Sequence, residues 1–192
     1  MKCIAQIRIT PDQVMLNGQV VSIATEEAAS TPQGKAMLTA LYKQQVGDYP
    51  KFYKMDPLAR LGFIASELLL QQVDEEHFVE REDRAIVLIN RSASLAADRK
   101  YEQTIQEGDD YFPSPADFVY TLPNIVTGEI AIRHHYHGET TFLVVEEPND
   151  ELLQQLIAQA FADPMTTSVL GGWLECEDEN HFEAHLGLYY RQ

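Results

Sequence analysis

Apolar and polar residues follow two different periods along this chain, and the periods separate strands from helices. Lys2–Ile9 alternates with a period of two, which predicts a β-strand. Arg84–Asn90 is an almost continuous apolar run, typical of a strand that is covered on both faces. Thr140–Val145 combines apolar and β-branched residues and predicts a further strand.

Helical spacing of apolar residues marks the segments between these strands. Asp56 and Pro57 predict the start of a helix that runs to about Gln72, because Asp caps a helix and Pro fits its first position. The same spacing predicts four more helices: 36–41, 114–120, 124–136 and 150–161. Within 124–136, Gly128 is expected to allow close packing at a helix contact.

The C-terminal part of the sequence predicts more β-structure. Thr167–Leu170 is expected to form a strand that ends in a tight turn at Gly171-Gly172, and 173–190 is expected to form a hairpin. Strands interleaved with helices predict one α/β domain over residues 1–192, built on a mixed sheet.

Composition places limits on the environment of the chain. Its 192 residues are 45% hydrophobic, enough for one packed domain. No apolar stretch approaches the roughly 20 residues of a membrane span, and the N-terminus has no signal-like apolar block. We therefore expect a cytoplasmic protein. Cys3 and Cys176 are too few for a disulfide framework; Cys3 is expected to be a small core side chain, and neither thiol is expected to react.

The net charge of −16 argues against nucleic acid as a partner. The charge is uneven: residues 35–60 carry five bases and two acids, whereas residues 139–192 carry eleven acids and one base. The simplest interpretation is a solvated surface, and an acidic partner would favour the 35–60 region.

Histidines cluster at His134, His135 and His137, which raises the question of a metal site. Adjacent histidines at a helix end point in different directions, and a strand would hold His181 and His185 too far apart to share an ion. The sequence therefore predicts no metal and no cofactor, and places these histidines at a helix C-terminus before Gly138.

Residues 113–138 contain three short motifs: Ser114-Pro115-x-x-Phe118, Leu122-Pro123-Asn124 and the Ile-Ala-Ile-Arg run before Gly138. Together they resemble the approach to the nucleophilic cysteine of β-ketoacyl-acyl-carrier-protein synthases, condensing enzymes of the thiolase-like fold. It extends more thinly over about 50–175 and is closest to short ketosynthase N-terminal-like proteins of pigment and aryl-polyene pathways. The resemblance implies structural roles for six residues: Pro123, Asn124, Gly128, Gly138, Gly171 and Gly172.

The nucleophile that the resemblance calls for is missing. Counted without gaps, the cysteine position is occupied by Glu147, and a carboxylate is poorly suited to hold an acyl chain as a thiolate does. The sequence also ends before the half that carries the family's two catalytic histidines. The resemblance therefore implies a pseudoenzyme. In the alternatives, Glu147 is a base that acts on an acyl thioester, for example in malonyl decarboxylation, or a surface acid before a helix that begins near Asn149.

For the fold, the resemblance implies one thiolase-like half, with helices on both faces of a mixed, about five-stranded sheet and a C-terminal hairpin. Loss of the second half is expected to leave apolar surface that needs a cover, to which the hairpin could contribute. In the family, the strand before the nucleophile pairs with its copy in a second subunit. The corresponding residues here are Thr141, Phe142, Leu143, Val144 and Val145.

The expected function is that of a catalytically incomplete accessory or scaffold subunit in acyl-carrier-protein dependent fatty-acid or polyene biosynthesis. It would form a homodimer or pair with a complete ketosynthase. Contact with an acyl carrier protein would use Lys43, Lys51, Lys54 and Arg60. The alternatives are an acyl-thioester enzyme and a module that binds an acyl chain or lipid.

Overall fold

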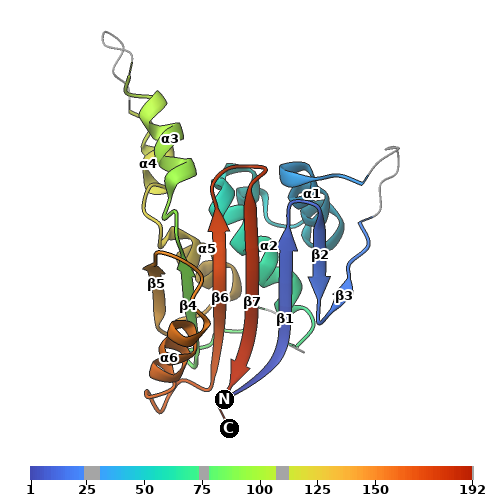
Figure 1. The fold of residues 1–192 in the computed structure, drawn as a ribbon, viewed down its shortest axis with the longest axis vertical. Coiled ribbons are helices and arrows are strands. Elements are labelled where there is room, and N and C mark those ends of the chain that lie inside the picture. Colours follow the sequence, from blue (N-terminus) through green and yellow to red (C-terminus); the bar gives the residue numbers. More distant parts are fainter. Residues whose placement is uncertain (24–30, 74–77, 107–112, 192) are drawn as a thin grey trace.

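A single open sheet of seven strands organises the chain, with helices on both of its faces (Figure 1). The computed structural model describes residues 1–23, 31–73, 78–106 and 113–191. The strands are β1 (Lys2–Thr10), β2 (Gln13–Leu16), β3 (Gln19–Val20), β4 (Arg84–Asn90), β5 (Thr140–Val144), β6 (Ser168–Cys176) and β7 (Phe182–Tyr190). Their order in the sheet is β3-β2-β1-β7-β6-β4-β5.

The sheet is mixed, which confirms the predicted α/β class. β4 runs parallel to both β5 and β6, and the other neighbouring strands are antiparallel. The sheet has more strands than the expected five because β2 and β3 extend it beyond β1. Asn17 and Gly18 form the β2–β3 turn with positive φ angles of 51° and 81°. An Asn-Gly pair is a strong hairpin signal, but the elements predicted from the sequence did not include this hairpin.

The helices divide unequally between the two faces of the sheet. They are α1 (Gly34–Leu41), η1 (Tyr42–Val46), η2 (Pro50–Lys54), α2 (Pro57–Leu70), α3 (Leu95–Gln103), α4 (Pro115–Val119), α5 (Ile125–His134) and α6 (Asp150–Ala160). α1, α2 and α5 lie behind the sheet in Figure 1, and α2 is buried along nearly its whole length. Among the described residues no helix is long and apolar enough to cross a membrane.

Close contact between α2 and α5 depends on Gly62 of α2. A Cβ atom at Gly62 would lie 2.4 Å from Cγ2 of Val126 and 3.0 Å from Cδ2 of Leu174. The expectation that Gly128 serves close packing is wrong within this chain, because a Cβ added at Gly128 meets nothing within 4 Å. The sequence did not indicate this packing role of Gly62, because the residues around it have the apolar pattern of an ordinary buried helix.

The predicted C-terminal hairpin exists as β6 and β7, which pair from Ser168 with Tyr190 to Cys176 with Phe182. It lies in the middle of the sheet and therefore does not cap an exposed face (Figure 1). The predicted turn at Gly171-Gly172 is wrong, since both glycines lie inside β6. A glycine inside a strand often marks a close approach of another backbone. Here a Cβ at Gly172 would lie 2.0 Å from the carbonyl oxygen of His185.

The prediction that Cys3 is a core residue is also wrong, because its side chain is exposed. The register between β1 and β7 shifts between Cys3 and Ala5. This bulge takes Cys3 out of phase with Ala5 and Ile7, which are buried as the alternation predicted. Ile4, inserted at the bulge, remains 42% exposed.

The face of the sheet that carries α6 is only partly covered. α6 packs on β4 and β6, and Figure 1 shows β7, β1 and β2 without a helix in front of them. On this face β1 carries exposed Gln6 and Arg8, and β7 carries half-buried Glu183 and exposed His185. Arg8 donates to Glu183 with Nη2 2.6 Å from Oε1. This part of the face is therefore polar and is not the apolar surface that was expected to need a cover.

Asp56 caps α2 as predicted. Its Oδ1 accepts from the backbone N–H of Ala59 at 3.0 Å and its Oδ2 from that of Leu58 at 3.2 Å. Burial nevertheless raises the pKa of this carboxyl to about 6, with these backbone donors opposing the shift. At neutral pH the Asp56 carboxylate that caps the helix is therefore a partly buried charge, which is unfavourable for stability.

We expect Asp56→Asn to remove a pH dependence of stability. The folded protein binds a proton at Asp56 between about pH 4 and 6 that the unfolded chain has lost, so the stability of the wild type falls as pH rises through this window. Asn keeps the cap without the charge. The variant should match the wild type near pH 4 and exceed it by about 2 kcal/mol above pH 6.5 in urea unfolding. A difference that does not vary with pH would contradict this.

Candidate functional site

β5 is an edge strand of the sheet, with β4 as its neighbour on the inner side. Glu139 O accepts from Ile86 N at 2.8 Å, and Val145 N donates to Asn90 O at 2.7 Å, so these odd-numbered positions face β4. The alternation of a parallel ladder then turns the backbone groups of Thr140, Phe142 and Val144 outward. β5 thus presents a free pairing edge that another strand could extend.

The side chains around this edge are apolar and exposed. Leu143 and Val144 on β5 are 37% and 52% exposed. α5 packs beside β5, and its Ile132 is the most exposed large apolar side chain of the described residues, at 62%. Leu122, in the turn before α5, is 48% exposed. We call Leu122, Gly128, Ile132, Leu143 and Val144 the edge surface; its apolar character marks it as the candidate functional site.

Gly128 adds an independent indication. It lies inside α5, four residues before Ile132 and so on the same side of the helix, with open space where a Cβ would be. A glycine within a helix costs about 1 kcal/mol relative to alanine, and the described packing of this chain gains nothing from it. A partner that approaches α5 closely would explain why the position holds glycine.

Glu147, at the expected nucleophile position, lies exposed in the bend between β5 and α6. The side chain that caps α6 is Asn149, whose Oδ1 accepts from the backbone N–H of Leu152 at 2.9 Å. Asp150 and Glu151 follow in the first turn, where acids favour the helix dipole. The surroundings of Glu147 are those of a surface acid near a helix start.

Three further motif residues differ in role. Asn124 precedes α5, but its side chain makes no capping bond; its carbonyl accepts from the hydroxyl of Thr127 at 2.7 Å. Gly138 is required by packing, because a Cβ there would lie 2.3 Å from the carbonyl oxygen of Arg84. It lets the segment before β5 pass close to the start of β4. Pro123 is half-buried in the turn between α4 and α5.

The four residues predicted to contact a carrier protein differ in whether their charged groups are bound within the chain. Lys51 lies 2.7 Å from the buried Glu129 through Nζ and Oε2, and Arg60 donates to the carbonyl oxygens of Phe52 and Tyr53. Lys43 and Lys54 are exposed. Two of the four cations, Lys51 and Arg60, are thus bound to groups of the chain itself, although Lys51 is also exposed.

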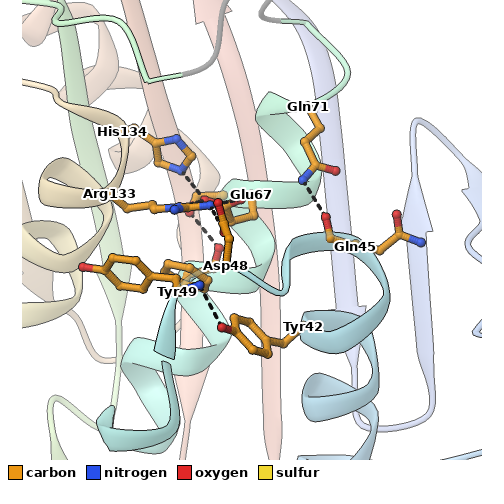
Figure 2. A network of polar contacts seen from close by, with 10 residues as sticks. Tyr42, Gln45, Asp48, Tyr49, Glu67, Gln71, Arg133 and His134 are labelled. Atoms are coloured by element: carbon orange, nitrogen blue, oxygen red, sulfur yellow. Dashed lines mark hydrogen bonds and ion pairs between the residues drawn. The ribbon is translucent and has the colours of Figure 1, made fainter. Parts of the chain in front are cut away.

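The structure contains an ionic network between α5 and α2 that the sequence did not indicate (Figure 2). Arg133, the last residue of the Ile-Ala-Ile-Arg run, places Nε 2.6 Å from Oε1 of Glu67 and Nη2 2.7 Å from Oδ1 of Asp48. Glu67 lies on α2 and is buried. The guanidinium also lies over the rings of Phe78 and Tyr49, at 4.2 and 5.1 Å. This network ties α5 to α2.

The three histidines at the end of α5 separate. His134 is buried, with Nε2 3.5 Å from Oε1 of Glu67 (Figure 2). His135 is the C-cap residue in the left-handed region, with φ of 56°, and His137 is exposed. In the described parts of the chain no group of three or more His, Cys, Asp or Glu side chains is arranged to hold a metal ion.

Cys176 is buried, and its burial, followed by the charges of Asp56 and Glu175, raises the pKa of the thiol well above its ordinary value. A neutral buried thiol is a poor nucleophile.

Comparison with solved structures identifies the fold. The ishigamide ketosynthase/chain length factor matches with a TM-score of 0.68 and 16% identity, over 98% of this chain and 61% of that chain. A complex of the ketosynthase ApeO with its chain length factor ApeC from Xenorhabdus doucetiae matches with a TM-score of 0.65 and 14% identity, over 100% and 79%. The ketosynthase complex AntDE:AntF, which includes a type II acyl-carrier protein, gives 0.64 and 11%, over 99% and 62%.

The chain therefore has the ketosynthase fold that the resemblance at 113–138 implied, and it spans 61% of the length of the first of these structures. At these identities the similarity establishes the fold alone. No protein-family model matches the sequence, and no curated protein matches it either.

Proposed function

We propose that this protein is a catalytically incomplete, ketosynthase-like accessory subunit that pairs through β5 with another subunit of the same fold. Its place would be in acyl-carrier-protein dependent synthesis of a fatty acid or polyene. The observation that carries the proposal is the free edge of β5, flanked by the exposed apolar side chains of the edge surface.

Three further observations support it. Gly128 leaves room for close approach to α5, in a motif that resembles that of ketosynthases. The similar structures include complexes of a ketosynthase with a chain length factor and with an acyl-carrier protein. Glu147 is exposed in a bend, a poor setting for a base that must act on a desolvated thioester.

We expect Val144→Asp to break this pairing. The substitution places a charge in the middle of an interface without changing the buried core, since Val144 is half exposed. The tagged chain would be affinity-purified from its source cells and the co-purified proteins identified by mass spectrometry. A ketosynthase-fold protein should accompany the wild type, and its recovery should fall on the order of tenfold or more with Val144→Asp.

Glu147→Ala is the matched control for the enzyme alternative, because it alters a second exposed residue close to the same edge. Recovery of the partner should fall far less than with Val144→Asp, because the substitution removes one exposed charge at the end of the strand and places none inside the interface. Turnover of malonyl- or acyl-loaded carrier protein should not respond to the substitution. Equal recovery of partner with wild type and Val144→Asp would count against the β5 interface. Thioester turnover that requires Glu147 would replace the proposal with an enzymatic function.

A further inference from the structure

The geometry of β5 restricts how two identical copies could pair. Two copies that join edge to edge about a two-fold axis bring β5 against itself in antiparallel orientation, so the start of one strand faces the end of the other. The outward groups of Thr140, Phe142 and Val144 would then bond to their own equivalents. A charged residue that precedes the strand in one copy therefore lies near a charged residue that follows the strand in the other copy.

Acids lie at both ends of this strand. Glu139 precedes it, and Glu146 and Glu147 follow it; all three side chains are exposed. In a pair centred on Leu143 or Phe142, Glu139 of one copy lies near the end of the other copy's strand, where Glu146 and Glu147 follow in the bend. Like charges at such positions oppose pairing, and the two-fold axis produces each contact twice.

The described cations that flank this strand in the sequence or follow its neighbour β4 are already bound within the chain. Arg91 follows β4 beside the end of β5, and its guanidinium is paired with Glu177. No Lys or Arg occurs between Arg133 and Arg191 in the sequence. Arg133 itself is bound to Glu67 and Asp48, and Arg191 donates to the carbonyl oxygens of Phe161, Asp163 and Thr166. Each copy also carries a net charge of −16, which adds a general repulsion between copies.

We infer that the β5 edge selects an unlike partner: a second ketosynthase-fold subunit whose own edge strand is flanked by Lys or Arg where this chain has Glu139, Glu146 and Glu147. The inference rests on the proposed function and decides between its two forms, the homodimer and the heterodimer. The apolar edge surface supplies the contact area, and the acids at the strand ends exclude self-pairing.

The test uses the chain itself as the probe. Glu139→Lys/Glu146→Lys/Glu147→Lys reverses the three charges at exposed positions and leaves the buried core unchanged. Sedimentation velocity would compare the wild type alone, the variant alone and an equal mixture of the two. We expect both proteins alone to remain monomeric at concentrations where the mixture forms a 1:1 dimer, with on the order of tenfold or more between the dissociation constants. High salt should reduce the difference.

The other possible results distinguish failure of the selection by charge from failure of the β5 interface itself. Self-association of the wild type as tight as that of the mixture would overturn the selection by charge and leave the proposed interface intact. Absence of a dimer in the mixture would overturn both. Val144→Asp in the lysine variant should abolish the mixed dimer; a mixed dimer that survives this substitution forms elsewhere on the molecule and also overturns the inference.

Discussion

Gly138→Ala should destabilise the folded protein by about 3 kcal/mol or prevent its accumulation. The added Cβ would lie 2.3 Å from the carbonyl oxygen of Arg84 and 3.2 Å from that of Glu82. Both contacts are with backbone of the segment that leads into β4, so no side chain can rotate away. Relief requires the start of β4, which is buried, to move relative to its parallel neighbours β5 and β6. Urea unfolding of the purified variant measures the effect.

Gly128→Ala is the matched control, since it makes the same change in the same motif. With nothing within 4 Å, the methyl group meets no described atom, and alanine is the better helix former. The isolated chain should therefore be unchanged or up to about 1 kcal/mol more stable. Comparable losses from the two substitutions would contradict the role assigned to Gly138. Weaker partner binding by Gly128→Ala in a stable chain would place α5 at the interface.

Arg133→Met should also cost about 3–5 kcal/mol of unfolding free energy. Methionine fills much of the space of the arginine stem, but it leaves the buried Glu67 carboxylate without the guanidinium that lies 2.6 Å from it (Figure 2). An uncompensated charge inside the fold is expensive even where the ion pair itself contributes little. Chemical denaturation at neutral pH checks the size of the loss.

Two variants separate this cause from a general loss of packing. Asp48→Asn removes the charge of the exposed partner of Arg133; the Asp48 side chain is 61% accessible. This variant should lose less than about 1 kcal/mol of unfolding free energy. Glu67→Met combined with Arg133→Met removes both buried charges and should recover most of the loss. If the double variant is as unstable as Arg133→Met, the network contributes through shape and not through charge.

Local patterns in the sequence predicted most elements of the fold, because each depends on neighbouring residues. The Asp56-Pro57 signal gave the start of α2, and the apolar run at 84–90 gave the buried strand β4. Two of the errors share a cause in the sheet. Gly171 and Gly172 resemble a turn, and only their packing against Ile157 and the His185 backbone shows why a strand carries them. Likewise, the bulge that turns Cys3 outward depends on β7, far along the chain.

The candidate site was predictable only in part. The strand at 140–145 was found from its composition and from the resemblance, and the structure places it at the sheet edge. The exposure of Ile132 and the open space beside Gly128 could not be foreseen, since an apolar residue on a helix is normally expected to face the core. The Glu67–Arg133 pair joins residues 66 positions apart, and nothing local to either residue indicates the other.

The most direct test of the account is amide hydrogen exchange of residues 140–144, in the chain alone and in its complex with the ketosynthase-fold partner. The account predicts that the outward amides of Phe142 and Val144 exchange readily in the isolated chain and become protected in the complex, because they gain hydrogen bonds to the partner's strand. Unchanged exchange at these amides in the assembled complex would show that the partner does not bind the β5 edge.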